Sequence, residues 1–122
     1  MYRITVLILC LFLQGCAEEK DSDESQETVY INNGAIQCES EGLSELETAQ
    51  QLIDNGIDVI LSTCGVLTGI STVTVCGAED IRINLHVINA QNLADAQELG
   101  FESVSSLKNE DGIGYMILGC EE

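Results

Sequence analysis

Apolar and polar residues alternate most clearly over residues 81–88, where "IRINLHVI" predicts a strand. One side of this strand carries Ile81, Ile83, Leu85 and Val87, and the other carries Arg82, Asn84 and His86. Shorter apolar or alternating runs predict extended segments over residues 29–38, 57–62, 72–76, 101–107 and 115–120. Residues 64–71 read as a loop.

Apolar residues at helical spacing separate these strands in two places. Ser44 and Glu47 form a capping box. The apolar stripe that follows consists of Leu46, Ala49, Leu52 and Ile53, and Gly56 ends this helix. Asn89 or Asn92 can cap a second helix, which has the stripe Leu93, Ala96 and Leu99 and ends at Gly100.

The two helices and the segments after them look alike. "AQQLIDNGIDV" from Ala49 and "ADAQELGFESV" from Ala94 each read helix, glycine, apolar residue, acid, strand. Two strand–helix–strand units in one small domain predict an α+β, ferredoxin-like (split βαβ) sandwich, with an antiparallel sheet and both helices on one face. Right-handed crossovers then place the first strand beside the last.

The amino-terminal residues follow another pattern. Residues 4–13 are an uncharged apolar run, too short to span a bilayer of ~30 Å and typical of a signal peptide. Leu13, Gln14, Gly15 and Cys16 follow, and this stretch resembles the lipobox of bacterial lipoproteins. The resemblance implies cleavage before Cys16, a diacylglyceryl group on its sulfur and acylation of the new amino terminus. An ordinary secretory signal is the alternative.

The expected organisation is a signal peptide over residues 1–15, a lipidated tether over 16–28 and a domain over 29–122. The tether is acidic, and a solvated spacer is favoured over a calcium loop because the glycine and distal glutamate of such a loop are missing. By resemblance to lipoprotein sorting, Ala17 implies the outer membrane, with the domain facing the periplasm.

Charge excludes one class of function. The mature chain keeps all 21 acidic residues and three basic ones, so its formal net charge is −18. Such a field repels DNA and RNA, and nucleic-acid binding is excluded. Such acidity favours cationic partners or divalent ions, but its commonest meaning is a soluble surface that does not adhere to other molecules.

Four cysteines remain in the domain, Cys38, Cys64, Cys76 and Cys120. An even number in an exported protein predicts two disulfides. The expected topology pairs Cys38 with Cys120 and Cys64 with Cys76, which is one of three possible pairings. A zinc site is disfavoured because no CxxC pair is present. A reactive cysteine would have only one imidazole, His86, as its partner.

The sequence carries no GxSxG, HExxH or phosphate-binding glycine loop, so we assign no catalytic residue, metal or cofactor and do not expect an enzyme. Arg82, Asn84 and His86 are the candidate binding face if the open side of the sheet carries them. A plain solvated strand face is the simpler interpretation.

The order of elements over residues 29–107 is loosely similar to the SPOR domain, which implies peptidoglycan binding, although the acidity departs from that family. "GIDVILSTCG" and "CGA" resemble small exported bacterial domains and imply no function. Our first hypothesis is a lipid-anchored, non-catalytic envelope module that has a structural role or binds an envelope protein or the cell wall. The alternatives are a thiol or redox protein and a divalent-cation binder.

Mass spectrometry of the native protein tests the lipid anchor. We expect a chain that begins at Cys16 and carries acyl groups, because the lipobox directs both processing steps. An intact Met1 without any acyl mass would contradict the envelope assignment.

Overall fold

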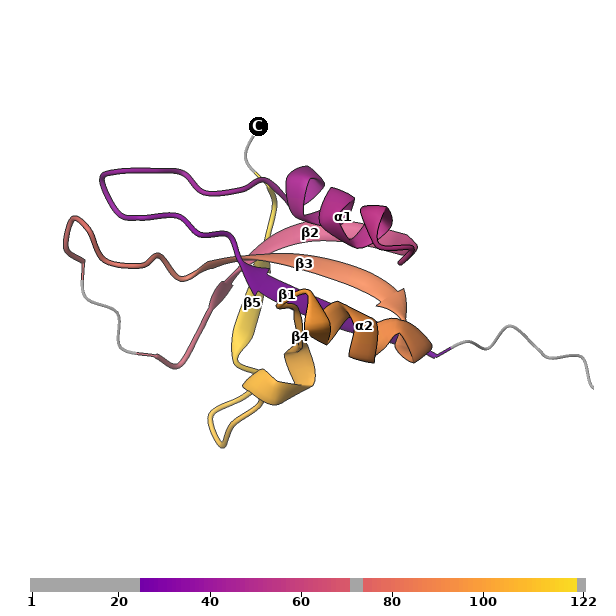
Figure 1. Ribbon diagram of the computed structural model, residues 1–122. Coiled ribbons are helices and arrows are strands. Elements are labelled where there is room, and N and C mark those ends of the chain that lie inside the picture. Colours follow the sequence, from indigo (N-terminus) through magenta and orange to yellow (C-terminus); the bar gives the residue numbers. More distant parts are fainter. Residues whose placement is uncertain (1–24, 71–73, 121–122) are drawn as a thin grey trace, which may run out of the picture.

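A computed structural model describes residues 25–70 and 74–120 of the chain. They form a sheet with two α-helices and two 3-10 turns (Figure 1). In chain order the elements are β1 (Gln26–Asn32), α1 (Glu45–Asp54), β2 (Val59–Leu67), β3 (Arg82–Asn89), η1 (Ala90–Asn92), α2 (Leu93–Glu98), β4 (Glu102–Ser103), η2 (Val104–Leu107) and β5 (Tyr115–Leu118). No helix in these two stretches has the length and apolar character needed to cross a membrane.

The sheet has five strands in the order β4-β1-β3-β2-β5, and every neighbouring pair is antiparallel. Helix α1 connects β1 to β2, which lie on either side of β3. Helix α2 connects β3 to β4, which lie on either side of β1. The prediction that the first strand lies beside the last is wrong, because β5 is added at the far edge and pairs with β2.

Both helices pack on the same face of the sheet. Leu52 of α1 and Ala96 of α2 are fully buried and share one core with residues from the strands and from the segments after the helices. The remaining members of this core are Val29, Ile57, Ile88 and Phe101. At ~25 cal/mol for each Å² of apolar surface removed from water, burial of this apolar core is the main favourable term in folding.

The repeated pattern in the sequence corresponds to two equivalent helix ends. Gly56 and Gly100 both have positive φ, +81° and +98°. The residues after them, Ile57 and Phe101, donate their N–H groups to Leu52 and Ala96 over 3.0 and 3.1 Å and are themselves buried. Each glycine therefore ends its helix and turns the next apolar side chain into the core.

The predicted ends of α1 agree with the structure, but one of its faces differs. Before α2, neither Asn89 nor Asn92 makes the predicted side-chain cap hydrogen bond. The capping box is present: the Ser44 hydroxyl accepts the Glu47 N–H, and the Glu47 carboxylate accepts the Ser44 N–H. Within the predicted stripe, Ala49 and Leu52 are buried whereas Leu46 and Ile53 are exposed. Thr48 takes the buried position instead, because it hydrogen-bonds to the sheet.

Two strands have other bounds than predicted. β1 runs from Gln26 to Asn32 rather than over residues 29–38, and β2 extends into the expected loop as far as Leu67. Gly65 is needed inside that strand, because a Cβ there would lie 2.6 Å from the Met116 carbonyl oxygen. The strand predicted over residues 72–76 lies partly outside the described residues, and residues 74–76 are not in a strand.

The number of disulfides is confirmed, but their predicted pairing is wrong. Cys38 is joined to Cys76, and Cys64 is joined to Cys120. Cys120 follows β5, whose Leu118 pairs with Cys64, so the sheet register brings these two together. The loops after β1 and before β3 extend from the same end of the sheet, where Gln37 and Ala78 share a hydrogen bond, and this brings Cys38 to Cys76 (Figure 1).

The double substitution Cys38→Ser/Cys76→Ser is expected to lower the free energy of unfolding by ~2–4 kcal/mol, because it releases the constraint on a long loop in the unfolded chain. Urea unfolding followed by circular dichroism measures this loss. Far-ultraviolet spectra of the folded state should stay unchanged, since both residues are exposed and lie outside the core.

Peptide mapping of the unreduced protein checks the disulfide pairing. Chymotrypsin suits this purpose because it can cut after Leu67, whereas trypsin has no site between Cys64 and Cys76. A Cys64–Cys76 peptide would contradict the topology.

Candidate functional site

A groove with a volume of about 640 Å³ lies at the amino-terminal end of α1, beside the Cys64–Cys120 disulfide. Its walls come from the segment that leads into α1, from the start of β3, from the middle of β2 and from the end of β5. The charged residues in its lining are Glu41, Glu45, Asp80 and Arg82, and the larger apolar ones are Leu43, Val66, Ile81, Ile83 and Leu118.

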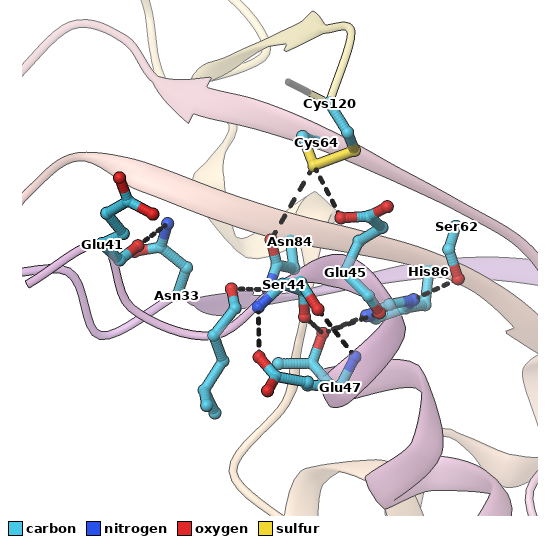
Figure 2. The surroundings of a disulfide bond; sticks show 12 residues. Asn33, Glu41, Ser44, Glu45, Glu47, Ser62, Cys64, Asn84, His86 and Cys120 are labelled. Atoms are coloured by element: carbon cyan, nitrogen blue, oxygen red, sulfur yellow. Dashed lines mark hydrogen bonds between the residues drawn. A yellow bond between two sulfur atoms is a disulfide. The ribbon is translucent and has the colours of Figure 1, made fainter. Parts of the chain in front are cut away.

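Buried amides hold the wall formed by residues 41–43. Asn33 donates from its Nδ2 to the Glu41 carbonyl over 3.5 Å, and Asn84 donates from its Nδ2 to the Leu43 carbonyl over 3.0 Å (Figure 2). The Leu43 N–H donates to the Asn33 carbonyl over 2.7 Å. Gly42 allows this close approach, because its φ is +76° and a Cβ would lie 2.4 Å from the Asn33 oxygen. The wall is therefore formed before any ligand arrives.

Glu45 is the first residue of α1, and the capping box sets its direction. Figure 2 shows its side chain extending from the helix toward the disulfide. One carboxylate oxygen, Oε2, lies 3.7 Å from Cys64 Sγ. A disulfide sulfur carries no proton, so this is a contact and not a hydrogen bond. The Glu45 carboxylate thus remains an acceptor that can receive a donor from a ligand in the groove.

The charges that line the groove leave it negative. Arg82 Nε lies 2.9 Å from Asp80 Oδ2, so these two side chains compensate one another. Apart from Arg82, no cation lines the groove, so Glu41 and Glu45 have no compensating charge among the lining residues. The groove combines two uncompensated carboxylates with apolar surface.

Glu45, Cys64 and Cys120 place one oxygen and two sulfur atoms within 4.8 Å of one another, which is a spacing that metal ligands use. Only a thiolate sulfur is a strong metal ligand, and here the two sulfurs are bonded to each other. In the oxidised protein the cluster therefore offers one carboxylate and no thiolate.

His86 lies on β3, two residues beyond Asn84, and is fully buried between α1 and the sheet. Its Nε2 is 2.8 Å from the Thr48 hydroxyl on α1, and its Nδ1 is 2.7 Å from the Ser62 hydroxyl on β2. The edge of its ring meets Phe101, with centroids 5.8 Å apart. Burial lowers the pKa of His86 from 6.5 to about 4, so the imidazole is neutral at pH 7.

The hydroxyl geometry favours one tautomer. The Thr48 hydroxyl also lies 3.3 and 3.2 Å from the Ser44 and Glu45 carbonyl oxygens, which can only accept. Its single proton goes to these carbonyls, so it accepts from His86 Nε2–H. Nδ1 then accepts the Ser62 proton. All polar atoms of the imidazole are satisfied, and the residue joins α1 to β2.

The predicted binding face of Arg82, Asn84 and His86 does not form. His86 and Asn84 are 0% and 2% exposed, because this side of β3 is the one that α1 covers. The solvated-face interpretation is wrong for the same two residues. Arg82 alone is exposed, and Arg82 and Asn84 line the groove.

Sequence reasoning missed Glu41, Glu45 and the end of β5 as lining residues. One signal was present: the capping box fixes Glu45 in the first turn of α1. A comparison of the chain with protein-family models, with curated proteins and with solved structures found no match.

The low pKa of His86 predicts a specific pH dependence of stability. In the unfolded chain His86 titrates near 6.5 and in the folded protein near 4, so the unfolded state binds more protons between these values. The stabilisation is complete above pH 6.5, declines as the pH falls and is lost below about pH 4, with a total on the order of 3 kcal/mol.

We expect the His86→Gln variant to lack this dependence, because glutamine does not titrate. The gap in unfolding free energy between wild type and variant should shrink from pH 7 to pH 4 in urea titrations. Comparing the two chains cancels the response of the many shared carboxyl groups. A gap that stays constant over this range would contradict the buried neutral imidazole.

Proposed function

We propose that this chain is a lipid-anchored protein of the bacterial envelope whose domain binds a positively charged segment of a partner protein, without catalysing a reaction. The observation that carries the proposal is the preformed groove with two uncompensated carboxylates, Glu41 and Glu45, beside apolar surface. The lipid anchor at Cys16 and its outer-membrane placement remain predictions from the lipobox resemblance.

A lysine or arginine side chain matches this lining. Its aliphatic stem packs against residues such as Leu43 and Leu118, while its charged head reaches the carboxylates. The net charge of the mature chain, −18, would steer a basic partner to the domain and repel an acidic one. Salt should weaken this steering because the groove is open to solvent.

We further propose that β1 to β4 and the two helices are a ferredoxin-like sandwich, with β5 as an addition beside β2. The strand order β4-β1-β3-β2 and the shared core of both helices support this interpretation. The same order keeps a SPOR-like, peptidoglycan-binding function as an alternative. The acidic groove favours a basic polypeptide over a glycan strand.

A thiol or redox function is the second candidate, because the half-buried Cys64–Cys120 disulfide lies in the groove wall beside Glu45. Alkylation before and after mild treatment with a dithiol distinguishes the two. Selective opening of this disulfide, together with a failure of the domain to bind a basic peptide, would favour the redox candidate.

The test ligand is a peptide in which Lys alternates with Val and whose termini are acetylated and amidated. Glu45→Gln is expected to weaken its binding. Loss of one half-buried charge contact costs ~1 kcal/mol, or about a fivefold higher Kd. Isothermal titration calorimetry on the purified full chain measures Kd, and the effect should diminish as salt rises.

Glu98→Gln is the matched control, since it removes the same charge from an exposed position on α2 outside the groove. Equal weakening by both variants would show that net charge acts without a groove. A peptide with Glu in place of Lys should not bind.

A further inference from the structure

Strand β5 forms an edge of the sheet with an unusual surface. Met116, Ile117 and Leu118 are 52%, 62% and 43% exposed. Successive residues of a strand point to opposite faces, so exposure of all three means that neither face of β5 is covered by the described residues.

The outer edge of β5 also presents unpaired backbone groups. The Thr68 N–H donates to the Gly114 carbonyl over 2.9 Å, and Cys64 pairs with Leu118 further along the same register. Hydrogen-bonded pairs alternate in an antiparallel ladder. Met116 and Leu118 therefore direct their backbone groups toward β2, while Tyr115 and Ile117 direct theirs outward, where the sheet order ends.

The two edges of the sheet differ. β4, at the opposite edge, has two residues and passes directly into the η2 turn, so it offers almost nothing to pair with. Natural edges avoid unwanted pairing by being short, charged or interrupted by proline. β5 reads Tyr-Met-Ile-Leu and has no charge and no proline.

We infer that β5 accepts an extended, basic segment of a partner protein as an additional antiparallel or parallel strand. This inference rests on the proposed function and extends it, because the acidic groove and the open edge meet at Leu118 and Gly119. Backbone pairing along β5 supplies affinity, and side chains near that end reach the carboxylates of Glu41 and Glu45. The occupant is thus defined by both surfaces: extended backbone and positive charge.

A second copy of this chain fits the edge less well. Pairing two strands of this length buries far less than the ~1,200 Å² of a stable interface. Each copy would also bring a net charge of −17 to the contact. Charge complementarity therefore selects a basic partner over self-association.

Backbone methylation of the Lys–Val peptide tests the inference on the purified full chain. N-methyl groups on its two central residues remove hydrogen-bond donors from both edges without altering a side chain. The same groups on its two last residues are the matched control. One N–H of the central pair faces β5 whichever edge of the peptide binds. We expect its loss, worth ~1 kcal/mol, to raise Kd about fivefold, and the terminal pair to have a smaller effect.

Amide hydrogen exchange gives a second readout. Binding of the unmethylated peptide should slow exchange at Tyr115 and Ile117 and leave β4 unchanged. If central methylation has no effect while Glu45→Gln still weakens binding, the groove stands and strand addition is wrong. If the unmethylated peptide does not bind at all, both proposals fail. A dimer in which these amides are protected without peptide would overturn the inference in favour of a second copy.

Discussion

The arrangement of this domain depends on the buried contact between α1 and the sheet through His86. The imidazole joins Thr48 on the helix to Ser62 on β2, and it does so as a neutral group with both nitrogens used. An unpaired polar group at this depth would cost ~1–3 kcal/mol, so the contact permits one orientation of the helix. That orientation places Glu45, at the start of α1, over the disulfide.

The two disulfides restrain the parts of the domain that lie outside the hydrophobic core. The six core residues lie between the helices and the centre of the sheet, whereas the groove and β5 lie at its side. The Cys64–Cys120 bridge fastens the end of β5 to β2, and the Cys38–Cys76 bridge joins the two long loops. Each therefore restrains a part of the chain with little apolar burial, which a small domain has few other ways to stabilise.

Local signals in the sequence predicted local structure well. Which face of the sheet the helices cover was harder to predict. The Ser44 capping box, the glycine helix ends and the alternating strand after residue 81 are fixed by neighbours in the chain. Alternation shows which residues share a face but not which face a helix will cover. His86 looked solvent-facing because its partners, Thr48 and Ser62, are distant in sequence. The predicted disulfide pairing followed from the misplaced last strand. The groove could not be predicted because its walls come from four segments that are distant in sequence.

Nitrogen-15 NMR of the His86 ring tests the central claim most directly. The account predicts a neutral Nε2–H tautomer, with Nδ1 as an acceptor, that persists unchanged from pH 7.5 to about pH 5. Because His86 is the single histidine of the chain, its signals need no separation from others. A ring that titrates near pH 6.5, or one that carries its proton on Nδ1, would contradict the buried bridge between helix and sheet.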